Sequence, residues 1–84
     1  MPIGTPTLSG IAGDNQNILN WNSILGADSY NVYRFSVLWG NVAQLGFTDH
    51  SAQNGVNYQY QVAAVVSGQE GPKSNVVSLT PEPK

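Results

Sequence analysis

The chain has 84 residues, of which 40% are hydrophobic and 10% are charged, and its net charge at pH 7 is -2. This length accommodates one small domain, and the absence of cysteine excludes disulfides, thiolate metal sites and a cysteine nucleophile. Three Lys and Arg residues cannot build a basic face, so neither nucleic acid nor a membrane surface is an expected partner. We also expect no membrane-spanning segment, since no apolar run approaches ~20 residues, and no signal peptide at the N-terminus.

Proline-bearing segments form both ends of the chain, at residues 1–6 and 81–84. Proline fixes φ and cannot donate to a sheet ladder, so these segments are expected to be extended and solvated, like linkers cut from a longer chain. The sequence therefore predicts a single domain over residues 1–84, with its core at about residues 5–81 and linker-like ends.

Apolar and polar residues alternate between these ends, and no stretch keeps the spacing of an amphipathic helix. In chain order, strands are expected at residues 7–9, 18–22, 30–35, 42–45, 46–49, 58–65 and 75–80. The side chains expected to face inward are Leu19, Trp21, Tyr30, Val32, the stem of Arg34, Tyr58, Tyr60, Val62, Ala64, Val77 and Leu79. Turns are expected at residues 13–16, 26–29 and 54–55, and a loop at residues 67–74. Seven strands at this spacing predict an all-β sandwich.

An ordered series of short motifs runs through most of the chain. In sequence order they are Leu19-x-Trp21, Gly26-Ala27-x-x-Tyr30-x-Val32-Tyr33-Arg34, Phe47-Thr48-Asp49, Gly55-x-x-Tyr58-x-Tyr60-x-Val62-x-Ala64-Val65, Glu70-Gly71 and Ser74-Asn75-x-Val77-Ser78-Leu79-Thr80-Pro81. Together they resemble a fibronectin type III domain. The resemblance is to the bacterial type, as found in secreted polysaccharide-degrading enzymes and in phage or surface proteins.

The resemblance implies a seven-stranded immunoglobulin-like β-sandwich, with strands A, B and E in one sheet and C, C′, F and G in the other. It also implies that Tyr58 is the corner tyrosine, whose hydroxyl bonds to the backbone near Ala52, where the family usually has leucine. Residues 67–74 hold no Arg-Gly-Asp, so integrin binding by that route is not expected. An extracellular or secreted location follows from the resemblance alone.

The polar residues do not predict a catalytic or metal site. Asp49, His50 and Ser51 are consecutive, so alternate side chains point to opposite faces of a strand and cannot form a relay, and His50 is expected to be exposed. The carboxylates lie in separate turns rather than paired as in glycosidases. Asp14 beside Asn15 could ligate calcium, but the spacing of a calcium loop is missing and a turn role is favoured. We therefore expect no enzyme activity, no cofactor and no metal.

Residues 35–40 place a second tryptophan outside the expected core. Trp39 could stack on a sugar ring or anchor a protein contact, or it could fold back over the sheet edge and complete the core. By alternation, an apolar outer face is expected, lined by Tyr33, Phe35, Ala63, Val65 and Val76. The candidate interface comprises Tyr33, Phe35, Leu38, Trp39, Val65 and Val76.

The sequence therefore favours a non-catalytic structural, spacer or interaction module of a larger extracellular protein, such as a bacterial glycoside hydrolase. Such a module would be a monomer in isolation and would pack against neighbouring domains of its parent chain. The alternative is a carbohydrate- or protein-binding module that uses the segment from Phe35 to Trp39, with Asn31, Asn41 and Gln44 as polar groups. An engineered binding scaffold is a variant of that alternative, which residues 67–74 disfavour because they lack the composition of a selected paratope.

Overall fold

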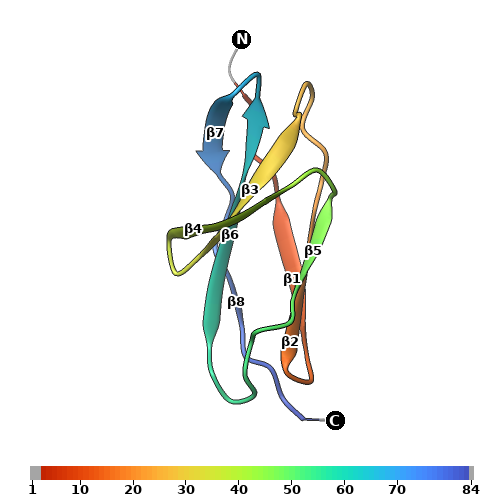
Figure 1. Cartoon of the computed structure of the whole chain (residues 1–84), viewed down its shortest axis with the longest axis vertical. Coiled ribbons are helices and arrows are strands. Elements are labelled where there is room, and N and C mark those ends of the chain that lie inside the picture. Colours follow the sequence, from red (N-terminus) through yellow and green to blue (C-terminus); the bar gives the residue numbers. More distant parts are fainter. Residues whose placement is uncertain (1–2, 84) are drawn as a thin grey trace.

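The computed structural model describes residues 3–83, which form eight β-strands and no helix (Figure 1). Within these residues there is accordingly no helix that could cross a membrane. The strands are β1 (Leu8–Gly13), β2 (Gln16–Trp21), β3 (Ser29–Arg34), β4 (Val37–Val42), β5 (Gly46–Asp49), β6 (Tyr58–Val66), β7 (Gln69–Lys73) and β8 (Val77–Leu79).

The strands pair into two antiparallel sheets. One sheet has the order β1-β2-β5, and the other has the order β4-β3-β6-β7, with β8 also paired to β6. These are the expected sheets A-B-E and C-C′-F-G, so the predicted all-β sandwich is confirmed. The strand count is eight rather than seven because β7 forms where a loop was expected, whereas β8 lies within the expected final strand at residues 75–80, and both pair with successive parts of β6.

A buried serine separates these two pieces. The Ser74 hydroxyl accepts a hydrogen bond from the Val62 amide at 2.9 Å, and the Ser74 amide donates to the Val62 carbonyl at 2.7 Å. The serine side chain thus satisfies a β6 amide that a backbone carbonyl would satisfy in a regular ladder. The expectation of a loop at residues 67–74 is wrong, because a two-residue turn at Ser67 and Gly68 leads directly into β7.

The strand that follows β3 begins earlier than expected. Because residues 35 and 36 alone make the turn, Val37 already pairs with Arg34 and β4 runs from Val37 to Val42. The expected strand at residues 42–45 is therefore wrong, and Trp39 belongs to a hairpin strand at one side of the sandwich (Figure 1).

Both ends of the chain are packed more closely than linkers would be. The Pro6 and Pro81 side chains are fully buried, and Ile3 packs against the core. The Pro81 carbonyl accepts a hydrogen bond from the Gly55 amide at 2.9 Å. The expectation of solvated ends is therefore wrong at these residues. Residues 1, 2 and 84, which the same expectation included, lie outside the described part of the chain.

The core consists of the inward faces that the alternation predicted. The buried members from β2, β3 and β6 are Leu19, Trp21, Tyr30, Val32, Tyr58, Tyr60, Val62 and Ala64, and Val77 and Leu79 pack against them. The Tyr58 hydroxyl accepts a hydrogen bond from the Gln53 amide at 2.9 Å, next to the buried Ala52. Tyr58 is therefore the corner tyrosine that the resemblance implied.

Two tight turns share one geometry but differ in their residues. Phe35 and Ser36 join β3 to β4 with φ angles of 55° and 64°, and Ser67 and Gly68 join β6 to β7 with φ angles of 51° and 82°. A two-residue hairpin turn with both φ angles positive favours Asn followed by Gly. The turn at Phe35 and Ser36 has neither residue, so its backbone is strained by roughly 1 kcal/mol or more.

Replacing Ser36 by glycine is expected to raise the free energy of unfolding by about 0.5 kcal/mol, because glycine adopts the left-handed conformation without a Cβ clash. The opposite change at the second turn, Gly68→Ala, is expected to lower it by about 1 kcal/mol. A Cβ at position 68 would meet no atom within 4 Å, so this change tests the backbone alone. Urea denaturation measures both effects, and a destabilised Ser36→Gly variant would contradict the strain assigned to this turn.

Candidate interaction surface

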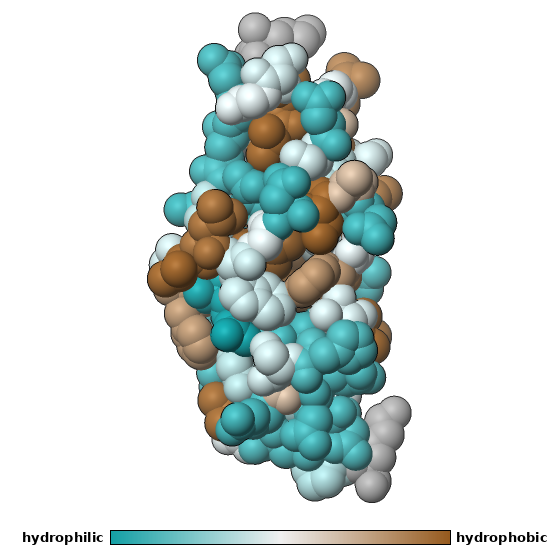
Figure 2. All heavy atoms as spheres, viewed as in Figure 1, coloured by the Kyte–Doolittle hydropathy of each residue, from teal (hydrophilic) through white to brown (hydrophobic). Residues whose placement is uncertain are grey.

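The hairpin formed by β3 and β4 presents three exposed apolar side chains within four residues. Phe35 is 51% exposed, Val37 66% and Leu38 56%. Figure 2 shows hydrophobic side chains projecting at the side of the molecule where Figure 1 places β4. The other exposed large apolar residues are spread over the molecule, at Ile11, Leu25, Leu45, Val56 and Val76. We name Phe35, Val37 and Leu38 the hairpin tip.

Trp39 does not belong to this exposed cluster. The pairing of Val32 with Gly40 and of Tyr33 with Leu38 leaves Trp39 as the extra residue of a β-bulge. Its side chain is partly buried against the core, and its ring meets the Phe47 ring edge-on, with centroids 5.1 Å apart. Of the two roles considered for Trp39, covering the edge of the sandwich is the one this geometry supports.

Arg34 lies among the aromatic rings at this edge. Its guanidinium carbon is 4.6 Å from the centroid of the Trp39 ring and 5.5 Å from that of Tyr58. The Phe35 ring in turn contacts Tyr58, with centroids 5.7 Å apart. The aromatic side chains of the hairpin are therefore engaged with each other and with Arg34, and they offer no open stack of parallel rings.

Arg34 also pairs with a fully buried carboxylate that the sequence interpretation placed in a turn. The Asp49 carboxylate accepts hydrogen bonds from Tyr60 at 2.6 Å, from Arg34 at 3.1 Å, and from the Ser51 hydroxyl and amide at 2.7 and 2.9 Å. Asn17 completes the cluster by donating to the Tyr60 hydroxyl at 2.9 Å. The alternation of side chains along β5 could have predicted that Asp49 is buried, because Asp49 lies two residues after Phe47, which faces inward.

The protonation states in this cluster follow from burial and hydrogen bonding. Burial alone raises the pKa of Asp49, but hydrogen bonds from Tyr60, Ser51 and Arg34 outweigh it and hold that pKa below its ordinary value. Burial, and then the bond to Asp49, raise the pKa of Tyr60, so the phenol remains a donor. His50 lies on the exposed side of the same segment, as expected, and it is not a member of this cluster.

The outer face of the larger sheet is a polar ladder, and the expected apolar face is wrong. The Tyr33 hydroxyl bonds to Glu70, which also accepts from Asn31 at 2.8 Å, and the Lys73 ammonium lies 4.4 Å from the Tyr33 ring centroid. The bond to Glu70, aided by burial, raises the pKa of Tyr33 to about 12. Phe35 lies elsewhere because the turn carries it beside the inward-facing Tyr58.

The remaining residues of the candidate interface do not join the hairpin tip. Val65 is partly exposed near the end of β6, and Val76 is exposed in the break between β7 and β8. Ala63 pairs with Asn31 and so lies on the outer face as expected, but it is fully buried. Phe35 and Leu38 are thus exposed side by side at the hairpin tip. Tyr33 and Trp39 are largely buried, and they lie in separate places.

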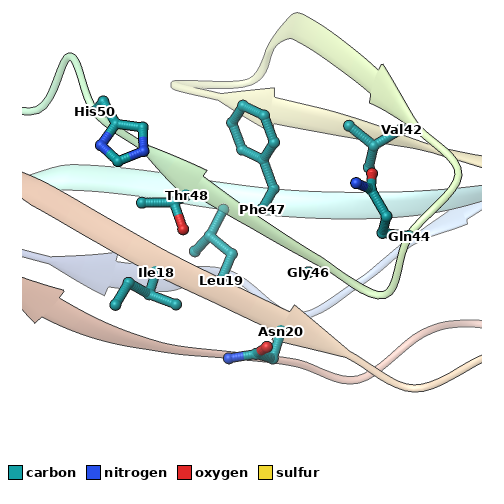
Figure 3. Close-up of a pocket in the computed structure, with 9 residues that line it drawn as sticks. All are labelled: Ile18, Leu19, Asn20, Val42, Gln44, Gly46, Phe47, Thr48 and His50. Atoms are coloured by element: carbon teal, nitrogen blue, oxygen red, sulfur yellow. The ribbon is translucent and has the colours of Figure 1, made fainter.

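An open groove of about 650 Å³ runs beside β5, the outermost strand of the smaller sheet. Figure 3 shows Phe47 and Thr48 along it, with His50 toward one end and Val42 and Gln44 toward the other. Ile18 and Asn20 of β2 lie on the same outer face of the smaller sheet as Thr48, whereas Phe47 points to the core side of β5 (Figure 3). Sequence reasoning did not identify this groove, since residues from three separate segments converge on it only in the folded chain.

Comparison with known proteins decides the family. No family model matches the chain. An Fn3-like protein from Clostridium thermocellum is 31% identical, and the match covers 100% of this chain and 97% of that one with a TM-score of 0.88. The chain belongs to the fibronectin type III family. The resemblance stated from the sequence motifs is thereby confirmed, along with the immunoglobulin-like sandwich that it implied.

Fibronectin type III domains similar to this one occur as parts of longer proteins. An amylopullulanase of Thermoanaerobacter thermohydrosulfuricus is 37% identical over 82 residues, covering 88% of this chain but 6% of that protein. A tail tube protein of Bacillus phage SPP1 is 34% identical over 82 residues, covering 95% of this chain and 31% of that protein. This domain therefore spans less than a third of either relative.

Proposed function

We propose that this fibronectin type III domain is a non-catalytic module of a larger extracellular protein that degrades polysaccharide, and that its hairpin tip packs against a neighbouring domain. The similarity to part of an amylopullulanase supports the first half of this proposal. The exposed apolar cluster of Phe35, Val37 and Leu38 carries the second half. A hairpin tip that is both apolar and strained is a typical feature of a contact surface.

The chemistry of the hairpin tip favours a protein partner over a sugar. Stacking on a sugar, the role considered for Trp39, needs an open aromatic ring with polar groups beside it. Here the exposed apolar side chains of β4 are the aliphatic Val37 and Leu38, while the Trp39 ring contacts Arg34 and Phe47. Asn31 and Asn41, considered earlier as polar partners for a sugar, are bonded to each other at 2.8 Å on the outer face.

The described residues also support a module without catalytic chemistry of its own. Within residues 3–83 no group of three metal-ligating side chains comes together. The adjacent Asp49 and His50 face opposite ways, one buried and the other exposed. An engineered binder is not supported either, because the turn at Ser67 and Gly68 is too short to form a selected loop.

Replacing Val37 and Leu38 by serine is expected to disrupt the contact with the neighbouring domain without unfolding this one. In the parent protein, the amides of β4 should exchange with deuterium at least about tenfold more slowly than in the isolated domain, and the double variant should remove this protection. Ile11→Ser is the matched control, because Ile11 is equally exposed but lies on β1. Equal exchange of β4 in the parent and in the isolated domain would refute the contact.

The proposal for the whole module is tested separately. The isolated domain is expected to release no reducing sugar from starch, pullulan or cellulose above the buffer control. Deleting it from the parent is expected to leave the hydrolysis of a short soluble substrate unchanged. Hydrolysis by the isolated domain would refute the non-catalytic role whatever the outcome at the hairpin tip.

A further inference from the structure

We propose that the groove beside β5 is a binding site for a neutral, hydroxyl-rich ligand, namely a short segment of an oligosaccharide. The groove is distinct from the hairpin tip, and the proposal does not depend on what the hairpin tip contacts. It is about 650 Å³ in volume and open to solvent, so a ligand can reach it from the surface. The polar groups that could contact such a ligand are the side chains of Asn20, Gln44, Thr48 and His50.

The residues that line the groove select against charged ligands. None of them is Asp, Glu, Lys or Arg, and the polar side chains are two amides, a hydroxyl and an imidazole. A phosphate or carboxylate would lose its hydration in this groove without meeting an opposite charge. Amide and hydroxyl groups can both donate and accept, as sugar hydroxyls do, and the apolar Ile18, which lies on the same face of the smaller sheet as Asn20 and Thr48, can contact the carbon face of a sugar ring.

Asn20 differs from the other asparagines in a way that points to a ligand. The chain has nine asparagines, and the side chains of the other eight each make at least one hydrogen bond within residues 3–83. The side chain of Asn20 makes none within the same residues, although it lines the groove. The other asparagine side chains hold strands and turns together through hydrogen bonds, whereas the Asn20 amide remains available to bind a ligand.

Gly46 keeps the Asn20 amide in its position. Gly46 lies opposite Asn20 in the pairing of β2 with β5, and a Cβ at position 46 would lie 3.0 Å from the Asn20 Oδ1 atom. Any larger residue at position 46 would therefore displace this side chain. The absence of a side chain at Gly46 both opens the groove and lets the Asn20 amide lie across β5.

An extended peptide that adds to the free edge of β5 is the competing occupant, and the structure disfavours it. Strand addition draws its affinity from a row of backbone hydrogen bonds. β5 has only four residues, from Gly46 to Asp49, and short edge strands are a common way for proteins to avoid such pairing. A ligand in this groove can therefore make more contacts with the free side-chain groups than with the backbone of β5.

Amide-resolved NMR titration of the domain with maltohexaose, cellohexaose and xylohexaose tests the proposal. We expect saturable shifts of the Asn20, Gly46 and Thr48 amides with at least one sugar, at a dissociation constant of about 1 mM. Asn20→Ala and Gln44→Ala are each expected to weaken binding about threefold or more, and the double variant about tenfold. The thermal midpoint of these variants should remain within about 2 °C of the parent domain, because both residues are exposed.

Gln59→Ala is the matched control, since Gln59 is an exposed amide of β6 outside the groove, and it should leave binding unchanged. Three results of the sugar titration would overturn the proposal. They are the absence of saturable shifts with all three sugars at about 10 mM, shifts centred on Phe35 to Leu38 instead of β5, and full affinity in the double variant. An acetylated Thr-Val-Thr-Val-Thr-Val peptide that shifts the β5 amides where the sugars do not would assign the groove to peptide and would also overturn it.

Discussion

Replacing Asp49 by alanine is expected to lower the free energy of unfolding by about 3 kcal/mol or more. The carboxylate is fully buried, and removing it leaves Arg34 without its counter-ion and the buried Tyr60 hydroxyl without its acceptor. A domain of this size has a total stability of roughly 4–12 kcal/mol, so the variant should be close to unfolding at 37 °C. Urea denaturation with far-UV circular dichroism measures the loss.

Glu70→Ala is the matched control for this prediction. Glu70 also bonds to a tyrosine, but it is exposed on the outer face, so its loss should cost less than about 1 kcal/mol. Similar losses for Asp49→Ala and Glu70→Ala would contradict the central role assigned to the buried cluster.

The stability that Asp49 contributes is expected to depend on pH in a definite direction. Its folded-state pKa lies below the unfolded value of about 3.9, so the folded state favours the ionised carboxyl. The contribution is therefore complete above that unfolded value and is lost as the pH falls through the folded pKa.

The difference in stability between the wild type and Asp49→Asn should shrink between about pH 5 and pH 2. Hydrogen bonding also lowers the pKa of Glu70, so the difference between the two proteins, rather than either curve alone, reports on Asp49. A difference that grows toward acid pH would reverse the assigned sign.

Replacing Trp39 by alanine is expected to lower the free energy of unfolding by about 2 kcal/mol. A fully buried tryptophan would cost about 3–5 kcal/mol, and Trp39 is half-buried against Phe47 and beneath Arg34. If Trp39 were instead a free ligand-binding side chain, the same change would leave stability nearly unchanged. Thermal unfolding distinguishes the two roles.

Leu38→Ala provides the comparison within the same strand. Leu38 is exposed, so its truncation should change the free energy of unfolding by less than about 0.5 kcal/mol. A larger effect at Leu38 than at Trp39 would show that the β-bulge places these two side chains the other way round from the arrangement described here.

Sequence reasoning succeeded where a pattern is local and regular. The alternation along β6 places Tyr58, Tyr60, Val62 and Ala64 on one face, and all four are buried. It failed in the region of β4, because a turn at Phe35 and Ser36 carries none of the residues that normally signal such a turn. Because this turn was missed, the next strand was expected to begin at residue 42 instead of Val37, and the segment around Trp39 was interpreted as a loop.

The exposure of the candidate interface residues was predicted only in part, for a related reason. Alternation assumes a regular strand, whereas the bulge at Trp39 and the turn at Phe35 send these side chains away from the face that Tyr33 occupies. Phe35 and Leu38 proved to be exposed together, and the polar ladder over Tyr33 depends on Glu70, which is 37 residues away in the chain. No local pattern reports a partner at that distance.

The sequence by itself determined the all-β class, the two faces of the main strands and the family, because these depend on period-two burial and on ordered short motifs that can be read along one chain. Tertiary structure alone decided the buried Asp49 cluster, the covering of the sandwich edge by Trp39, and the groove where Asn20 is left free. Each of these joins residues from strands that are distant in sequence. Their energies come from burial and hydrogen-bond partners, which exist only once the two sheets have packed.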